Sequence, residues 1–315
     1  MQSKFISIIA PMYNEEQLVH DYCAHVKSAM NAIHDSYDYE ILLVNDGSAD
    51  RTLQRMSEAR EADPEHIAIV NLSRNFGLEG AVWAGLLRAE GDAVVVMDAD
   101  LQDPPTVIIQ LIEAWEGGAD IVHAVRAERR HDSFFKRLSA SVFYRVLKSM
   151  SGKLAVQPET ANFKLLSRNA LTELLKLPEC NPTFRSVVPF VGFKTAAIEY
   201  GRDKRFSGST KYGLRNMIPY ALNSLTCVSV APLRMIFWLI PISALATIFF
   251  LLLFLISSQD VWRTAFLMAV FISAFSTLFS FALSLIAEYT AQIMTEVKAR
   301  PISIVSEFIP TDRNN

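Results

Sequence analysis

The sequence has few cysteines and little net charge of either sign. Its 315 residues contain three cysteines, Cys23, Cys180 and Cys227, which are too widely spaced for a metal-ligand pattern or a disulfide framework. Such sparse usage is typical of a reducing compartment. The formal net charge of −3 gives no general attraction to polyanions. Nucleic acid is therefore not an expected partner, and any basic surface must be local.

Patterns of several other protein classes are also missing. The sequence shows no internal repeat and no low-complexity segment. The apolar run 5–12 is short and ends in a polar stretch, so no signal peptide is expected. No G-x-G-x-x-G pattern follows the first expected strand, which argues against a dehydrogenase-type dinucleotide site.

Long hydrophobic runs, in contrast, are present. The hydrophobic content is 51% and the mean hydropathy is +0.22, which is high for a purely soluble protein. Residues 235–258 and 264–287 contain no Asp, Glu, Lys or Arg, and each run exceeds the ~20 residues that cross a bilayer. The short connection 259–263 predicts a hairpin of two transmembrane helices, and the flanking basic residues predict that both chain ends are cytoplasmic. Residues 214–233 predict an interfacial helix, and 291–315 a cytoplasmic tail.

The first 125 residues alternate between strand and helix patterns. Strands are expected at 5–9, 39–44, 67–72, 93–97 and 121–125, where short apolar runs are rich in β-branched residues. Apolar residues at helical spacing occur between them. This order predicts an α/β fold in which helices cover a mainly parallel sheet.

Two carboxylates and an amide follow the fourth expected strand. Asp98, Asp100 and Gln102 leave its C-terminal end, before Pro104 and Pro105 stop the strand. Open α/β sheets bind their ligands at this edge. Carboxylate and amide oxygens suit a hard cation such as Mg²⁺ or Mn²⁺. A capped, solvated turn would use the same residue types, and for an isolated Asp-x-Asp that is the simpler interpretation.

Polar residues also follow the other expected strands. The strand exits read Pro11-Met-Tyr-Asn-Glu-Glu16, Asp46-Gly-Ser48 and Ser73-Arg-Asn-Phe-Gly77. Each exit alone could be a turn with a helix cap. Four of them on one edge of a sheet predict a crevice that holds carboxylates, an arginine and an aromatic ring. Such a crevice suits a phosphate group and a base.

These motifs resemble those of family 2 glycosyltransferases, which have a GT-A, Rossmann-like fold. The resemblance is carried by the exit of the first strand together with Val44-Asn-Asp-Gly-Ser-Ala-Asp50, Arg74-Asn-Phe-Gly77 and Asp98-Ala-Asp-Leu-Gln-Asp-Pro-Pro105. It covers about residues 4–301 and is similar to the polyprenyl-phosphate group, the bactoprenol glucosyltransferases and dolichol-phosphate mannose synthases. Relatives of this group are often tetramers, so the resemblance also implies a homo-oligomer.

The resemblance implies a role for individual residues. The nucleotide-sugar would be bound by Pro11, Tyr13, Asn14, Glu15, Val44, Asp46, Asp98, Ala99, Asp100, Arg126, Arg202 and Arg205. The metal, Mg²⁺ or Mn²⁺, would be held by Asp98, Asp100 and Gln102. The phosphate of the lipid acceptor would be bound by Arg137, Ser141 and Lys211.

A basic amphipathic segment at residues 126–150 separates the sheet motifs from the rest of the chain. An ordinary surface helix is one interpretation. Its phenylalanines and basic residues also suit an anionic membrane surface, and the downstream apolar runs favour this second interpretation. Arg137 and Ser141 are four residues apart and share one helix face.

The sequence departs from the family pattern at residues 157–166. Where the family usually reads Asp-x-Gly-Asp-Phe-Arg-Leu, this chain has Glu159, Ala161, Asn162 and Lys164. Asn162 occupies the position of the Asp often proposed as the catalytic base. The catalytic candidates are therefore Asp100, Asn162 and Glu159. Either the reaction needs no side-chain base, because a phosphate acceptor is already ionised, or Glu159 has taken over that role.

The sequence thus predicts a membrane-anchored, metal-dependent inverting glycosyltransferase, with its catalytic domain at 1–213 and its transmembrane part at 234–290. The favoured reaction transfers glucose from UDP-glucose to undecaprenyl phosphate, at the cytoplasmic face of a bacterial inner membrane, for cell-envelope glycans such as the lipopolysaccharide O-antigen. Transfer of N-acetylglucosamine, galactose, mannose or an aminoarabinose-type sugar is an alternative, as is an impaired scaffold that retains the fold. A processive synthase would need more membrane spans and a Gln-x-x-Arg-Trp motif.

Overall fold

The computed structural model describes residues 3–126, 160–179, 182–201 and 261–314, together with several positions between 241 and 252. The described residues belong to two compact units. The first holds those up to residue 201 and those from 300 onward, and the second holds those between 241 and 299. The segments 126–150, beyond Arg126, and 214–233, predicted to meet the membrane, lie outside the described residues.

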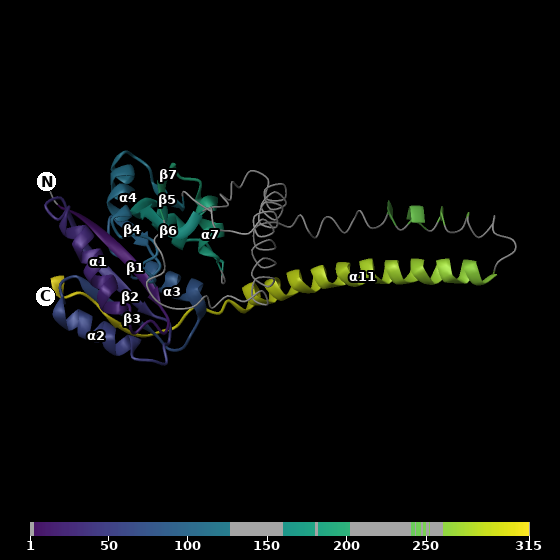
Figure 1. Ribbon diagram of the computed structural model, residues 1–315, viewed down its shortest axis with the longest axis horizontal. Helices are drawn as coiled ribbons and strands as arrows, with labels where there is room; N and C mark the ends of the chain where they lie inside the picture. Colours follow the sequence, from purple (N-terminus) through teal and green to yellow (C-terminus); the bar gives the residue numbers. More distant parts are fainter. Residues whose placement is uncertain are drawn as a thin grey trace. The chain divides into compact units, whose positions relative to one another are not determined.

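In the described part of the chain, eight strands form one sheet in the order β7-β5-β6-β4-β1-β2-β3-β8 (Figure 1). The strands are β1 (Lys4–Met12), β2 (Tyr37–Asn45), β3 (Ile67–Leu72), β4 (Ala93–Val96), β5 (Ile121–Arg126), β6 (Thr160–Ser167), β7 (Thr195–Tyr200) and β8 (Val305–Ile309). The pairs β1–β2, β1–β4, β2–β3 and β5–β7 are parallel, whereas β6 and β8 run antiparallel to their neighbours. The predicted α/β fold with a mainly parallel sheet is confirmed.

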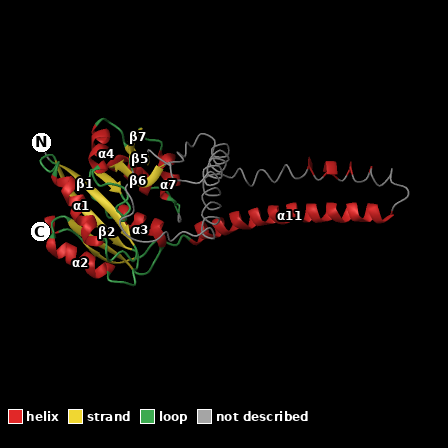
Figure 2. Cartoon of the chain, in the orientation of Figure 1, coloured by secondary structure: helices red, strands yellow, loops and turns green. Residues whose placement is uncertain are grey.

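Helices cover both faces of the sheet (Figure 2). They are α1 (Val19–Asn31), α2 (Thr52–Ala62), α3 (Gly77–Leu86), α4 (Val107–Glu116), α6 (Arg168–Leu175) and α7 (Phe184–Val187), with short 3-10 turns η1 (Val188–Val191) and η3 (Asp312–Asn314). Strand residues alternate between two buried apolar clusters: Val95 packs with α1 and α4, and Val94 and Val96 pack with α3 and α6. Burial on both faces explains why the strands read as continuous apolar runs.

The C-terminal segment returns to the sheet as strand β8, which the sequence did not predict (Figure 1, yellow). It pairs antiparallel with β3, and the Ser73 N–H donates to the Ile304 carbonyl at 2.9 Å. Beyond the strand, Arg60 forms an ion pair with Asp312 at 2.6 Å. The segment therefore covers the backbone edge that β3 would otherwise expose.

The second unit is dominated by helix α11, Val261–Lys298, which is 38 residues long. Its stretch from Arg263 to Lys298 is the one helix in the described residues that is long and apolar enough to cross a membrane. The helix extends beyond the predicted span 264–287 because no Gly or Pro interrupts it before Pro301. Most of the other predicted span, 235–258, lies outside the described residues, so the two-helix hairpin is not confirmed.

Candidate active site

The predicted site residues meet at one edge of the sheet because the central strands are parallel. In register, Met12 at the end of β1 lies opposite Asn45 at the end of β2, and Ile9 lies opposite Val96 at the end of β4. The segments that follow these strands carry Asn14, Asp46 and Asp98, so all three leave the sheet on the same side. This arrangement is the one in which open α/β folds bind their ligands.

Hydrogen bonds connect the loops that follow β1 and β2. Asn14 adopts a left-handed backbone conformation, with φ of 54°. Its N–H donates to Ser48 Oγ at 3.0 Å, and its Oδ1 accepts from the Ala49 N–H at 2.9 Å. The Glu15 N–H donates to Thr52 Oγ1 at 2.9 Å. These contacts hold the two loops together.

The other predicted nucleotide-binding residues near these loops differ in exposure. Tyr13 is 40% exposed, and its contact with a base or ribose stays a prediction. Pro11 and Val44 pair with each other in the β1–β2 register, and both are buried. Their side chains therefore support these loops from within the fold.

Asp46 forms two hydrogen bonds within the fold that the sequence did not predict. Its Oδ1 accepts from the Phe76 N–H at 2.7 Å and its Oδ2 from the Gly77 N–H at 3.0 Å, at the start of α3. Burial raises the pKa of Asp46 although both hydrogen bonds favour its ionised form. Gly47 follows with φ of +62°, and a Cβ there would lie 2.3 Å from the Arg74 carbonyl carbon. The loops that follow β2 and β3 are therefore in close backbone contact at this point.

The acidic turn after β4 is strained and crowded with negative charge. Asp100 Oδ1 accepts from the Gln102 N–H at 3.2 Å, and Leu101 between them has φ of 53°. Asp98 Oδ1 is sealed from solvent and has no hydrogen-bond partner in the described part of the protein. Burial, and then repulsion from Asp103 and Asp100, raises the pKa of Asp98. A buried carboxylate oxygen without a hydrogen-bond partner is costly, and a metal ion at this turn stays a prediction.

Arg126 is held beside this turn by two residues without a predicted role. Asp103 is fully buried and accepts from the Tyr200 hydroxyl at 2.6 Å. Arg126 Nη2 donates to Asp103 at 3.3 Å, and Arg126 Nε donates to the Tyr200 hydroxyl at 3.4 Å. The contact of Arg126 with phosphates stays a prediction, but its guanidinium is placed by a rigid frame. Tyr200 ends a strand with ordinary alternation, so no sequence signal marked it.

A second polar group lies on the α3 and α7 side of the sheet. Asn162 in β6 is 1% exposed, and its Oδ1 accepts from Arg185 Nε in α7 at 2.8 Å. Lys164, on the same face of β6, is fully buried; its Nζ lies 5.2 Å from the centre of the Phe184 ring and has no hydrogen-bond partner among the described residues. Burial, and then Arg185, lowers the pKa of Lys164 to about 7. Opposite it in β5, burial lowers the pKa of His123 to about 4.

The remaining predicted site residues lie outside the described residues. They are Arg137, Ser141, Glu159, Arg202, Arg205 and Lys211. In the regions that the structure describes, no group of three or more His, Cys, Asp or Glu side chains forms a ready metal cage. The predicted metal ligands Asp98, Asp100 and Gln102 would therefore need further oxygens from a ligand.

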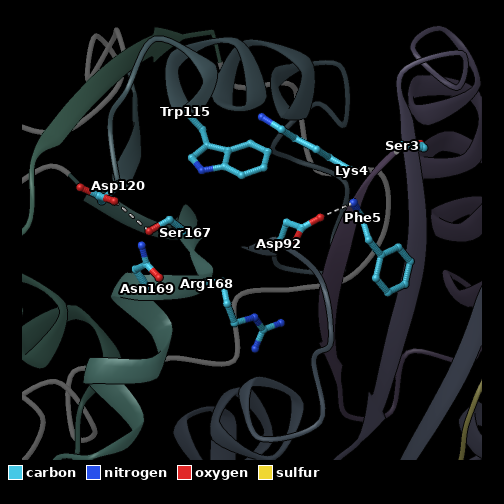
Figure 3. A pocket seen from close by; sticks show the side chains of 9 residues that line it. All are labelled: Ser3, Lys4, Phe5, Asp92, Trp115, Asp120, Ser167, Arg168 and Asn169. Carbon is cyan, nitrogen blue, oxygen red and sulfur yellow. Dashed lines mark hydrogen bonds between the residues drawn. The ribbon is translucent and has the colours of Figure 1, made fainter. Parts of the chain in front are cut away.

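A pocket of about 580 Å³ lies at the opposite edge of the sheet, where β1 begins (Figure 3). It is lined by Ser3, Lys4, Phe5, Asp92, Trp115, Asp120, Ser167, Arg168 and Asn169. Its charged groups are engaged in the fold: Asp92 accepts from the Phe5 N–H at 2.8 Å, and Ser167 donates to Asp120 at 3.1 Å (Figure 3). It contains none of the predicted site residues.

Comparisons with known proteins agree with this geometry. Residues 7–175 match the glycosyl transferase family 2 domain. The Bacillus subtilis (strain 168) protein named uncharacterized glycosyltransferase YkcC is 38% identical over 304 residues, which cover 96% of this chain and 93% of that protein. The prophage bactoprenol glucosyl transferase homolog of Escherichia coli (strain K12) is 36% identical over 229 residues, which cover 73% of this chain and 74% of that protein.

The structural comparison concerns the fold alone. Mannosyl-3-phosphoglycerate synthase from Rubrobacter xylanophilus aligns with a TM-score of 0.52 at 17% identity, over 74% of each chain. The fold and the family match together indicate a glycosyltransferase of the GT-A class. The chain belongs to glycosyltransferase family 2, because the family domain covers more than half of its length.

Proposed function

We propose that this enzyme transfers a hexose, with inversion, from a nucleotide-sugar to undecaprenyl phosphate. UDP-glucose is the favoured donor, because relatives at 36% identity over 73% of the chain are named bactoprenol glucosyl transferases. The observation that carries the proposal is the group of polar residues at the C-terminal edge of the sheet. It combines an exposed Tyr13, the hydrogen-bonded loops of Asn14 and Asp46, and an acidic turn in which Asp98 Oδ1 has no hydrogen-bond partner among the described residues.

Asp98, Asp100 and Gln102 are the residues that would hold a divalent cation. Asp98 has an oxygen without a hydrogen-bond partner among the described residues, and burial followed by repulsion from nearby carboxylates raises its pKa; both features fit a positive ion at this turn. Mg²⁺ is commonly bound by one or two carboxylates together with substrate phosphates, so two aspartates suffice. When bound, such an ion neutralises charge on a leaving diphosphate. Mg²⁺ and Mn²⁺ both meet these requirements.

The proposed reaction needs no side-chain base. Asn162 cannot take up a proton, but the proposed acceptor is a phosphate monoester with a second pKa of about 6. Near neutral pH its attacking oxygen is already ionised. The protein then has to place this dianion and reduce its repulsion from the donor. Arg137, Arg205 and Lys211 are the proposed residues for that task, and Glu159→Gln should then change kcat little.

The membrane placement rests on the second unit. Helix α11 is apolar, and large side chains such as Ile272, Phe279 and Phe281 are exposed along it. Exposed apolar surface of this extent suits a lipid environment. We infer a multi-pass protein of a bacterial inner membrane, with the catalytic unit in the cytoplasm and the acceptor reached from the membrane surface.

Mass spectrometry of the lipid product tests the proposal. The full-length enzyme is incubated with undecaprenyl phosphate, Mn²⁺ or Mg²⁺ and one donor at a time from a panel of UDP- and GDP-sugars. We expect a hexosyl-phosphoryl-undecaprenol with UDP-glucose. Product with another sugar would correct the donor, and donor hydrolysis that lipid phosphate does not stimulate would refute the acceptor. Binding of donor without turnover would favour the scaffold alternative.

A further inference from the structure

Asn162 is positioned by an arginine that no sequence motif marks. The Arg185 guanidinium contacts the Asn162 side chain through Nε and Oδ1, at 2.8 Å. A guanidinium has hydrogen-bond donors and no acceptor, so it is the amide oxygen that must face it. The NH₂ group is consequently turned away from Arg185.

Arg185 itself is held in place by helix α3. The Phe184 N–H at the start of α7 donates to Glu79 Oε2 at 2.8 Å. Trp83, one turn further along α3, donates from Nε1 to the Pro182 carbonyl at 3.1 Å. The Phe184 ring is fully buried beneath the same layer. Two hydrogen bonds and a buried ring therefore aim a helix of only four residues, and with it the Arg185 side chain.

Asn162 also lies at the edge of the sheet that carries the acidic turn after β4. Strands β4 and β6 are antiparallel, and the last recorded pair is Val96 opposite Lys164. Continuing this register by two residues brings position 162 opposite Asp98, in the acidic turn. If a cation and its phosphates bind at this turn, an amide donor at this place would lie near the phosphate oxygens of the substrate.

We propose that Arg185 is a positioning residue, which turns the NH₂ group of Asn162 toward a phosphate or sugar oxygen of the bound substrate. The inference rests on the proposed transfer reaction and specifies how position 162 takes part in it. In this enzyme the position donates a hydrogen bond, whereas a carboxylate there would present only acceptors to the substrate.

A double-mutant cycle tests the dependence of one residue on the other. Arg185→Met and Asn162→Ala should each lower kcat/KM by about tenfold, the effect of one well-placed hydrogen bond. If Arg185 acts through Asn162, the double variant should be no worse than the more severe single variant. Arg185→Lys should restore part of the activity, because it keeps a donor. Independent effects that multiply to about a hundredfold would overturn the proposal, as would an unimpaired Arg185→Met enzyme.

The KM values identify the substrate group. A rise in KM for undecaprenyl phosphate, with donor affinity unchanged by calorimetry, assigns the contact to the lipid phosphate. The reverse pattern assigns it to a sugar oxygen. Arg168→Met is the matched control, since Arg168 binds the carbonyls of Gly91 and Ala89 far from the crevice. It should lower thermal stability and leave kcat/KM within twofold.

The pH profile of Asn162→Asp separates a donor role from a base role. The titratable groups around an aspartate there would be Glu79 from α3, Arg185 from α7, Asp98 from the turn after β4, His123 from β5 and Lys164 from β6. If the position must donate, the activity of the variant relative to wild type falls as the pH rises and the new carboxylate ionises. A relative activity that rises with pH would show that the position favours a base, and would overturn the proposal. Wild-type transfer is measured first on the same preparation: its absence refutes the proposed function rather than the role of Arg185.

Discussion

Replacing Lys164 with methionine should stabilise the fold near neutral pH, and the gain should shrink as the pH rises. The Lys164 ammonium is fully buried and, among the described residues, has no hydrogen-bond partner. Burial, followed by repulsion from Arg185, lowers its pKa from 10.5 to about 7. Methionine has a similar volume and fills the same space without a charge.

The lowered pKa sets both the sign and the size of the effect. Below about pH 7 the lysine is charged in the folded protein, which then bears the full cost of the buried charge. Between about pH 7 and 10.5 the folded protein binds fewer protons than the unfolded chain, so the wild-type protein gains stability as the pH rises. At about 1.4 kcal/mol per pKa unit the full cost is about 5 kcal/mol. Structural relaxation reduces it, so we expect a gain of about 2 to 5 kcal/mol at pH 6.5 and less than half as much at pH 9.5.

Attraction between Lys164 and Glu79 opposes this gain but is too weak to reverse it. Repulsion from Arg185 affects the lysine more strongly than attraction to Glu79. The described residues include no ion pair between Lys164 and Glu79 within 4.0 Å. Removing the ammonium therefore breaks no close pair, which would be the costly case.

Urea denaturation of the detergent-solubilised enzyme, followed by tryptophan fluorescence, measures the effect. Trp83 is buried in the same layer as Lys164 and reports on this region. Lys176→Met is the control, because Lys176 is an exposed surface lysine and its removal should change the free energy of unfolding by no more than about 0.5 kcal/mol. A Lys164→Met protein that is less stable at pH 6.5, or whose gain is equal at both pH values, would refute the reasoning.

Four further substitutions test the predicted site and the contacts beside it. Asp100→Asn should lower transfer by on the order of 100-fold and abolish metal-dependent donor binding, because the amide lacks the charge that holds a cation. Calorimetry with Mn²⁺ measures the binding, and normal binding would contradict the metal assignment. Tyr200→Phe removes the hydroxyl that donates to Asp103 at 2.6 Å and should cost about 1 to 3 kcal/mol in urea denaturation. Gly47→Ala puts a methyl group 2.3 Å from the backbone at φ of +62°, and should lower the free energy of unfolding by at least about 2 kcal/mol. Gly77→Ala, at φ of +85° with nothing within 4 Å, is the comparison and should lower it only by the backbone strain of about 1 kcal/mol.

The sequence predicts the sheet and the edge at which the crevice lies, because both depend on local patterns. The strand at 93–97 is recognisable from its β-branched run, and Asp98 and Asp100 follow it directly. Once the strands are known to be parallel, their polar exits must share one edge. The family motifs add the class of enzyme, which the family domain match confirms.

The contacts that aim these residues could not be predicted, because they join residues far apart in the chain. Tyr200 is 97 positions from Asp103 and Arg185 is 23 positions from Asn162. Neither has a local pattern of its own. The carboxylate of Asp46 likewise reads as a ligand-binding group, while the fold uses both of its oxygens to start α3. Long-range pairing of this kind depends on the packed fold.

Strand β8 has a consequence for how the chain can be threaded through a bilayer. The described chain belongs to the first unit up to residue 201 and again from residue 300, where β8 pairs with β3, so the stretch between them starts and finishes on one folded body. A single hydrogen-bonded sheet cannot lie on both sides of a membrane, since its first and last strands must share a compartment. In the proposed membrane placement, the stretch between them would therefore cross the bilayer an even number of times. Helix α11 would be one crossing, and the uncharged run 235–258 is the proposed return. Under that proposal, a single-pass anchor would be incompatible with the paired tail.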